Sequence, residues 1–507
     1  MKQVYDFAFL GSGMGALVCA NILTKQGYSV VLLEKNQQFG GSLQSFSRDK
    51  RIFDTGVHYI GSLDEGQTLN KIFKYLNILD DLKLQRLDDE VFDQIRFPDG
   101  VTFNLGQGYD NFKSSLLKVF ADEEKIIDDF CDTIKDICTF FPLFNLKTGP
   151  KKSMGDWPDI LNVGAYEYLS SKTSNEKLIA ALLGNGPLYA GEKGVTPLYV
   201  TALIVDSFIN GSYRVKGGGS QLTKVLSRNI RSFGGELIKR ANVINIEVKD
   251  KEVKYFELED GRKVFAKNYI SNIHPLQTNE LIGAENLRPA YKKRIVKLEN
   301  TISSFTLYLS FKENSFPYIN YNIYDYFVEP KNVWDVQDYN KDIWPEVTFS
   351  CTAASIDQGE FADSLTVLTY MNYEETKAWT DSFNTAAYPG KRPDSYHEFK
   401  KQKEELVISR LEERFPGIRD CISSQYSSTP LTYKDYIGTD DGSLYGIKKN
   451  INNQAATSIN SKMRLKNMYL TGQNVVFHGI LGATISAIVT CMNFIDVEQL
   501  VKEIADE

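Results

Sequence analysis

The chain opens with a stretch at residues 9–35, FLGSGMGALVCANILTKQGYSVVLLEK, in which a glycine-rich turn separates two apolar runs. The pattern predicts a buried strand over residues 4–10, a tight turn over 11–16, a helix over 16–26 and a second buried strand over 30–33. This order is that of a Rossmann unit, which holds a dinucleotide pyrophosphate at the amino end of a helix.

The residue types in this stretch fit such a site. A side chain at Gly13 would hold the pyrophosphate away from the backbone N–H groups, and the small Ala16 lets helix and strand pack closely. Glu34 follows Gly11 by 23 residues, where a carboxylate accepts both ribose hydroxyls and repels a 2′-phosphate. We therefore predict a dinucleotide other than NADP, bound by Gly11, Ser12, Gly13, Met14, Gly15, Ala16, Glu34 and Lys35.

Two later segments favour FAD over NAD. Gly40 and Gly41, followed by Ser42, let the chain double back against the pyrophosphate. Near the end of the sequence, a strand over 468–470, a turn at Gly472 and a helix from about 482 to 494 are predicted. Gly479, Gly482 and Ala483 would place the positive end of that helix under the flavin ring. A surface turn and a plain core helix are the alternatives for these segments.

Composition narrows the class of protein. The 507 residues carry a net charge of −7, so no basic field attracts nucleic acid. Six scattered cysteines without a CxxC pair indicate reduced thiols and a cytoplasmic protein, and no metal site is predicted. The apolar start is interrupted by glycines, which argues against an export signal, and no run is long enough to span a membrane.

Several segments in order resemble the FAD-dependent family of phytoene desaturases, carotenoid isomerases and retinol saturases. They are FDTGVHYIG (53–61), the stretch 186–226, GGELIKRANVINIEV (234–248), YISNIHP (269–275) and YLTGQNVVFHGILGA (469–483). The resemblance implies an α/β fold with a discontinuous, glutathione-reductase-like Rossmann-type FAD-binding domain over 1–75, 215–275 and 430–507. It also implies an inserted α+β substrate domain over 76–214 and 276–429, containing an antiparallel sheet, and a contact between the Val243 backbone and adenine.

Within the substrate domain, alternating runs over residues 303–371 are typical of an antiparallel sheet with one face in water. Nine of the 23 residues from Phe305 to Phe327 are Phe or Tyr. They would either line a long apolar channel or simply pack the sheet, because aromatic residues favour strands in any case.

Catalytic candidates come from the segments that the family folds against the flavin. Gly56 and Val57 are expected to approach the ring, and His58 follows them. His58 is therefore a candidate to contact the cofactor and to polarise the substrate or move a proton near neutral pH, with a structural hydrogen bond as the alternative. His478 and Tyr59 are further candidates, with a solvated loop histidine and a packed strand tyrosine as the ordinary interpretations. No second dinucleotide motif supplies an NADPH domain.

The sequence thus predicts an FAD-dependent oxidoreductase that acts on a carbon–carbon double bond of a hydrophobic polyene or isoprenoid. A flavin amine oxidase and a prenyl-lipid-binding escort protein are the alternatives. Residues 136–146, DICTFFPLFNL, suggest peripheral membrane contact, with a buried helix as the competing interpretation. Substrate identity, reaction direction, electron donor and oligomeric state stay open.

Overall fold

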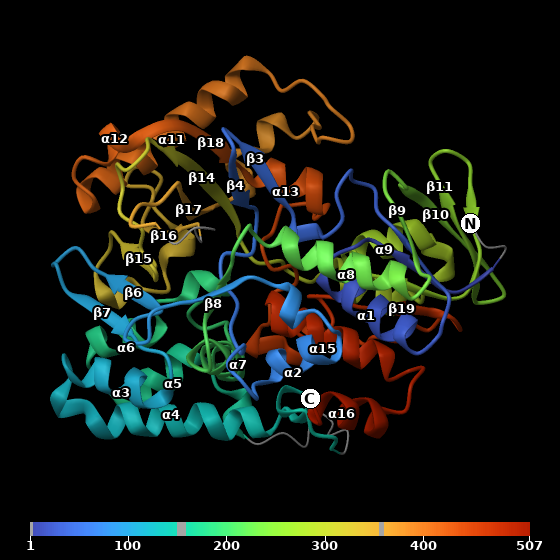
Figure 1. Cartoon of the computed structure of the whole chain (residues 1–507), viewed down its shortest axis with the longest axis horizontal. Helices are drawn as coiled ribbons and strands as arrows, with labels where there is room; N and C mark the ends of the chain where they lie inside the picture. Colours follow the sequence, from blue (N-terminus) through green and yellow to red (C-terminus); the bar gives the residue numbers. More distant parts are fainter. Residues whose placement is uncertain (1–3, 150–158, 354–358) are drawn as a thin grey trace.

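A computed structural model describes residues 4–149, 159–353 and 359–507 (Figure 1). Two sheets organise the chain: a five-stranded sheet near both termini and a seven-stranded sheet at the opposite end of the molecule.

The five-stranded sheet is entirely parallel, in the order β19-β13-β1-β2-β9. Its strands are β1 (Tyr5–Leu10), β2 (Val30–Leu33), β9 (Glu236–Ile238), β13 (Ala266–Ser271) and β19 (Met468–Leu470). The strands predicted over 30–33 and 468–470 are confirmed. Helix α1 (Met14–Lys25) begins two residues before the predicted start, because the extended backbone of Gly13 already serves as its N-cap.

Both faces of this sheet are covered. Alternate residues of β1 and β2, such as Phe7 and Leu32, pack against α1, α8 (Ser220–Ser232) and α15 (Gly479–Cys491). The intervening residues, such as Ala8 and Val31, pack against the antiparallel sheet β10 (Val243–Lys249), β11 (Glu252–Leu258) and β12 (Lys263–Val264). This layering confirms the predicted discontinuous Rossmann-type domain.

The seven-stranded sheet has the order β18-β14-β17-β16-β15-β6-β7. Its strands are β6 (Asp93–Arg96), β7 (Thr102–Leu105), β14 (Ser303–Phe311), β15 (Asn322–Tyr326), β16 (Val347–Thr352), β17 (Ser364–Met371) and β18 (Ile422–Ser428). The sheet is mixed rather than purely antiparallel, since β15 pairs with β6 in parallel. The predicted substrate-domain sheet is therefore present, with strands recruited from two distant parts of the chain.

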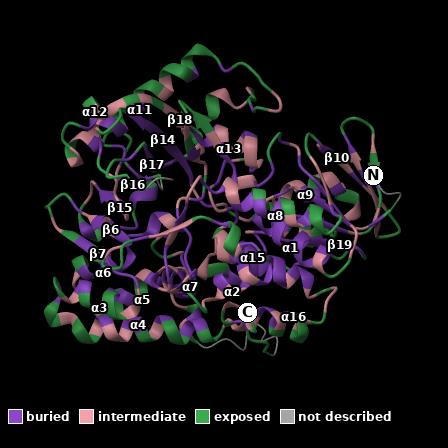
Figure 2. Ribbon diagram, viewed as in Figure 1, coloured by how far each residue is buried: buried purple, intermediate pink, exposed green. Residues whose placement is uncertain are grey.

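The expectation of a water-exposed face is wrong for the strands of residues 303–371, although β7 and β18 at the two edges of the sheet have exposed residues. Every residue of β14, β15, β16 and β17 is buried, and these strands are uniformly purple in Figure 2. The hairpin β3 (Ser45–Arg48) and β4 (Arg51–Asp54) covers part of one face, where the rings of Phe46 and Phe53 lie 4.9 and 5.5 Å from Tyr308. Thr306 pairs with Tyr433 at 2.7 Å, whereas the buried hydroxyls of Ser310, Thr348, Ser350 and Tyr370 have no hydrogen-bond partner in the described part of the chain.

The aromatic residues between 305 and 327 mainly pack the sheet. Phe311 stacks on Phe316 with centroids 4.5 Å apart, and Phe305 meets Trp344 edge to face. Among the nine aromatic residues of that stretch, Tyr324 alone lines the cavity described below. The packing interpretation therefore holds for most of the stretch.

Helices surround the two sheets. The described residues between 68 and 215 form six of the helices and, besides β6 and β7, two short strands. They are α2 (Thr68–Tyr75), α3 (Tyr109–Leu117), α4 (Glu124–Thr139), α5 (Ala165–Lys172), α6 (Glu176–Leu183), α7 (Leu198–Ile209), β5 (Leu84–Arg86) and β8 (Tyr213–Val215). Further along lie α9 (Pro275–Ile282), α10 (Pro289–Val296), α11 (Asp394–Arg414), α12 (Ile418–Cys421), α13 (Pro430–Ile437), α14 (Gln454–Thr457) and α16 (Val497–Ala505). Within the described ranges, none of these helices combines the length and apolarity that crossing a bilayer requires.

The strands of the parallel sheet and of the seven-stranded sheet fall in the segments expected for the two domains, while the domain boundaries themselves stay a prediction. The segment 136–146 is divided. Residues 136–139 finish α4, with Ile137 and Cys138 buried, whereas Phe140 is 37% exposed and Phe141 and Phe144 are half-buried.

Candidate functional site

A cavity of about 480 Å³ lies between the two sheets and is lined by residues from both. Its wall includes every residue predicted from the sequence to bind cofactor, with one exception. These are Gly11, Ser12, Gly13, Met14, Gly15, Glu34, Lys35, Gly40, Gly41, Ser42, Gly56, Val57, His58, Val243, Gly472, Gly479, Gly482 and Ala483. The exception is Ala16, which is fully buried in α1.

The first glycine turn packs against two distant segments of the chain. A Cβ atom at Gly13 would lie 2.6 Å from Nδ2 of Asn272, and one at Gly15 would lie 2.6 Å from the Cα of Gly472. Asn272 also accepts a hydrogen bond from the Ala16 N–H at 3.1 Å. The glycines are therefore required by close packing within the protein, in addition to the approach of a ligand.

The second glycine turn lies directly against the first. Gly40 has a left-handed φ of 119° and forms a parallel bridge with Gly13, and its N–H donates to the Ser12 hydroxyl at 3.0 Å. The Ser12 hydroxyl in turn donates to the Glu34 carboxylate. The chain therefore doubles back against the first glycine turn, where we predict that the pyrophosphate binds.

One end of the cavity carries the carboxylate predicted to bind ribose. Glu34 is 5% exposed, and its Oε1 accepts the Asn36 N–H at 2.8 Å. Val243, at the start of β10, lines the same cavity, as the adenine contact implied by the family requires.

Helix α15 presents its amino end to the cavity. It begins at Gly479, one turn before the predicted start, and no side chain caps it. Gly479, Ile480, Leu481 and Gly482 line the cavity, so the unpaired N–H groups of the first turn and the positive end of the helix dipole are available to a ligand.

The cavity wall also contains buried hydroxyl groups without a hydrogen-bond partner in the part of the chain that the structure describes. Among the described residues, the buried hydroxyls of Thr439 and Ser443 have no partner, and both residues line the cavity. Buried polar atoms are normally paired, so these hydroxyls fit a polar ligand. Together with the bare glycine backbone and Glu34, they match the polar groups of a dinucleotide. Within residues 4–149, 159–353 and 359–507, no cluster of three or more potential metal ligands occurs.

Beyond the helix α15 end, the cavity wall becomes apolar. It is formed by Phe144, Leu188, Leu203, Ile204, Phe208, Phe349, Leu368 and Phe477. Tyr59 and Tyr324 are set into this wall, with their hydroxyl oxygens 2.8 Å apart. These side chains give part of the cavity an apolar lining.

His58 and His478 both line the cavity. Burial lowers the pKa of each imidazole to about 4, and the charges of Arg214 and Lys449 act in the same direction on His58 and His478 respectively. Both rings are therefore neutral at pH 7, so the expectation that they exchange protons near neutrality is not supported by their surroundings. The His58 ring lies 5.4 Å from that of Phe349, and the His478 ring 4.8 Å from that of Tyr445.

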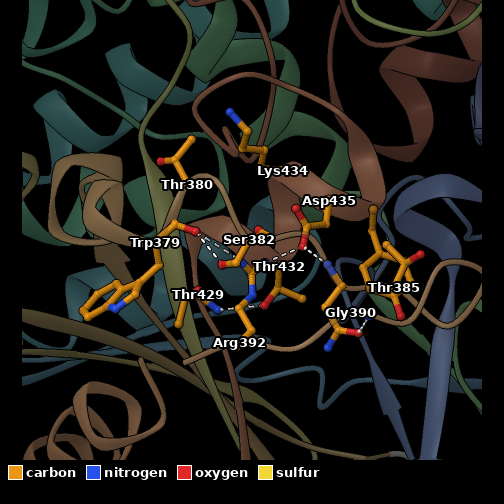
Figure 3. A network of polar contacts seen from close by, with 12 residues as sticks. Trp379, Thr380, Ser382, Thr385, Gly390, Arg392, Thr429, Thr432, Lys434 and Asp435 are labelled. Carbon is orange, nitrogen blue, oxygen red and sulfur yellow. Dashed lines mark hydrogen bonds and ion pairs between the residues drawn. The ribbon is translucent and has the colours of Figure 1, made fainter. Parts of the chain in front are cut away.

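A network of polar contacts holds helix α13 beside Lys35, the residue that follows Glu34. Arg392 donates to the Ser382 hydroxyl at 2.6 Å and forms a buried ion pair with Asp435 (Figure 3). Asp435 also accepts the Asn384 N–H at 2.9 Å, and its carbonyl accepts from Lys35 at 3.1 Å. The loop before α11, helix α13 and the residue after Glu34 are thereby joined.

Sequence reasoning missed several residues of the site. Asn272 lies in the quoted segment 269–275 but carried no signal of its own, because its role depends on contact with Gly13 and Gly472. Tyr324, Phe349 and Leu368 come from three strands of the second sheet. The position of Asn272 directly after a strand of the parallel sheet was the one clue available.

Comparisons with known proteins agree with this geometry. Residues 10–76 match the family described as NAD(P)-binding Rossmann-like domain. All-trans-retinol 13,14-reductase of Danio rerio is 24% identical over 96% of this chain and 85% of that protein. Prolycopene isomerase 2, chloroplastic, of an Oncidium hybrid cultivar is 26% identical over 88% of this chain and 75% of that protein. The chain is a distant homologue of these two proteins, nearly along its whole length.

Among solved structures, cyclohexylamine oxidase from Brevibacterium oxydans has a TM-score of 0.61 at 14% identity, covering 99% of both chains. At that identity the likeness concerns the fold. The chain therefore shares the fold of this amine oxidase and contains a Rossmann-like dinucleotide-binding domain.

Proposed function

We propose that this protein is an FAD-dependent oxidoreductase that acts on a carbon–carbon double bond of a hydrophobic conjugated polyene or isoprenoid. Carotenoids, retinoids and polyenoyl lipids are the substrate classes, and saturation, isomerisation or desaturation is the reaction. One observation carries the proposal: a single cavity joins a dinucleotide cradle, at Glu34 and the two glycine turns, to an apolar wall contributed by the second sheet.

Three features support FAD as the dinucleotide. Glu34 disfavours a 2′-phosphate, the paired turns at Gly13 and Gly40 leave room for a pyrophosphate between bare backbones, and the positive end of α15 faces the region where a second ring system would lie. When bound, FAD supplies two-electron redox chemistry. The protein holds the cofactor, orients the substrate and excludes water from the apolar end.

The apolar end supports a polyene. Its side chains offer extended hydrocarbon and aromatic surface, and the two homologues reported above are named for retinol and prolycopene. His58, Tyr59 and His478 are the residues that we propose to contact the reacting region. The neutral state of both histidines assigns them to hydrogen bonding or packing in preference to cationic acid catalysis.

The test begins with the purified protein. We expect flavin absorption bands, released by denaturation as FAD. Oxidised and dithionite-reduced protein is then incubated anaerobically with carotenoids, retinoids, polyenoyl lipids and primary amines, and products are separated by chromatography. Loss of a double bond identifies a saturase, gain a desaturase, and unchanged mass with altered retention an isomerase.

Two outcomes contradict the proposal. Turnover of amines alone would identify an amine oxidase, the function of the solved structure compared above. A colourless protein that takes up no FAD would favour lipid escort without redox chemistry.

A further inference from the structure

A chain of hydrogen bonds leads from the apolar wall of the cavity to a buried carboxyl group. The hydroxyl oxygens of Tyr324 and Tyr59 are 2.8 Å apart, and the Tyr59 hydroxyl donates to Oδ2 of Asp93 at 2.9 Å. Both tyrosines line the cavity, whereas Asp93, at the start of β6, is completely buried behind them.

The surroundings of Asp93 allow it to exchange a proton. Asn322 on β15 donates to its Oδ1 at 2.9 Å, and Asn185 donates to its Oδ2 at 3.4 Å. The positive charge of Arg214 on β8 acts on Asp93. The Arg214 guanidinium donates to Oδ1 of Asn322 at 3.1 Å and to the Ile319 carbonyl at 2.7 Å. Burial raises the pKa of Asp93 to about 7, although these donors and the Arg214 charge oppose the rise.

We propose that Tyr324 and Tyr59 conduct a proton between the cavity and Asp93, which acts as the proton store for the reaction at the double bond. The inference rests on the proposed function. Because Tyr324 and Tyr59 line the cavity they are catalytic residues, whereas Asp93 acts through them.

In a saturation, bound reduced flavin would supply a hydride equivalent to one carbon of the double bond, and the protein would supply a proton to the other. The new C–H bond to that proton uses the electron pair of the π bond as the Tyr324 O–H bond breaks. When Asp93 is protonated, its carboxyl donates to the Tyr59 hydroxyl, which in turn donates to Tyr324. Tyr59 then gives its proton to Tyr324, and the Asp93 carboxyl gives its proton to Tyr59. Asn322 and Asn185 stabilise the resulting carboxylate. Desaturation runs the same transfers in reverse.

A purely structural role for Asp93 makes a different prediction. Asparagine at this position would keep an acceptor for Asn322 and the link between β6 and β15, but it could not store a proton. Asp93→Asn therefore separates the two roles, and Tyr59→Phe and Tyr324→Phe interrupt the chain without removing a ring.

The chain offers matched controls on the same sheet. Tyr326 lies two residues from Tyr324 on β15, and its buried hydroxyl donates to the Gly184 carbonyl at 2.8 Å, away from the cavity wall. Asp325 is completely buried beside Arg414, with Oδ1 3.3 Å from Nε. Tyr326→Phe removes a buried hydroxyl, and Asp325→Asn replaces a buried carboxyl with an amide, in both cases outside the proposed chain.

The first experiment follows a single turnover of the FAD-loaded, dithionite-reduced enzyme with the polyene found in the substrate panel, in D2O and over a range of pH. We expect one solvent deuterium on each carbon of the former double bond, because the transferable hydrogen of reduced flavin also exchanges with D2O. The rate should fall as pH rises through about 7, since Asp93 then loses its proton. Asp93→Asn, Tyr59→Phe and Tyr324→Phe should each be about 100-fold slower, and Asp93→Asn should lose the pH step. The controls should keep the wild-type rate and profile. An unchanged pH step in Asp93→Asn would overturn the proposal.

The second experiment needs no turnover. Infrared difference spectra taken below and above pH 7 should show a carboxyl band that titrates near pH 7 in the wild type and in the controls but is absent from Asp93→Asn. Asp54 and Asp325 are also buried with raised pKa values, so the assignment uses the difference between Asp93→Asn and the wild type. If that difference contains no titrating carboxyl, the proton store does not exist. A wild-type protein that binds no flavin would instead contradict the proposed function.

Discussion

The hydroxyl of Ser12 donates to the carboxylate of Glu34 while accepting the N–H of Gly40, so one side chain joins both glycine turns to the carboxylate that we propose to bind ribose. Glu34→Ala removes the charged acceptor and leaves Ser12 without that partner. We expect the dissociation constant for FAD to rise at least about tenfold, because a hydrogen bond to a charged group contributes about 1.5–3 kcal/mol. Titration of flavin fluorescence measures this, and an affinity equal to that of the wild type would refute the assigned role. Ser12→Ala, which retains the carboxylate, should have a smaller effect.

The backbone of Gly472 leaves no room for a side chain at Gly15. An added Cβ would lie 2.6 Å from the Cα of Gly472, and a backbone cannot move as a side-chain tip can. Gly15→Ala should therefore abolish FAD retention during purification, as judged by the ratio of flavin to protein absorbance. Gly359→Ala is the matched control, since its added Cβ would have only ordinary contacts, at 3.7 Å and beyond. Full flavin content in Gly15→Ala would contradict the observed packing.

The two cavity histidines affect stability in acid. The folded-state pKa of His58 and of His478 is about 4, below the ordinary 6.5, so the unfolded chain binds protons more readily between these values. Their contribution to stability is complete above pH 6.5 and is lost as pH falls toward 4. His58→Gln and His478→Gln should each make this acid decline shallower in urea unfolding followed at several pH values. Asp54 and Asp93, with raised pKa values, act in the opposite direction, so each variant is compared with the wild type at the same pH.

The ion pair between Arg392 and Asp435 has side chains only 5% and 3% exposed. Arg392→Ala would leave an uncompensated buried carboxylate, and we expect a loss of about 3–5 kcal/mol in the free energy of unfolding. The double variant Arg392→Met with Asp435→Leu, which removes both charges, should recover much of that loss. Equal destabilisation by the single and double variants would show that shape, and not charge, is what the pair contributes.

Membrane contact by the end of α4 remains a hypothesis. Phe140 is 37% exposed there, and Phe144, a few residues on, lines the cavity, so a substrate could pass from a bilayer toward the apolar end. We expect the protein to float with liposomes and Phe140→Asp to reduce that binding. Phe233→Asp, at an aromatic residue 44% exposed after α8, should not. Wild-type protein that stays in solution would end the hypothesis.

Local sequence determined the cofactor half of this protein. The strand over 30–33, the carboxylate that follows it and the glycine turns are specified by residues close together in the chain, because strand burial, turn conformation and helix capping depend mainly on near neighbours. Those features were sufficient to predict a Rossmann unit and the cavity wall around it.

Tertiary structure alone decided the rest. The alternation in residues 303–371 shows which side chains are polar, but it cannot show that the β3–β4 hairpin covers part of the sheet. The face predicted to contact water is therefore found buried. Asn272 meets Ala16 across 256 residues, and Tyr59 reaches Tyr324 across 265. Contacts at such separations arise only when the chain packs, since the energy that selects them comes from burial shared among distant segments rather than from local backbone preference.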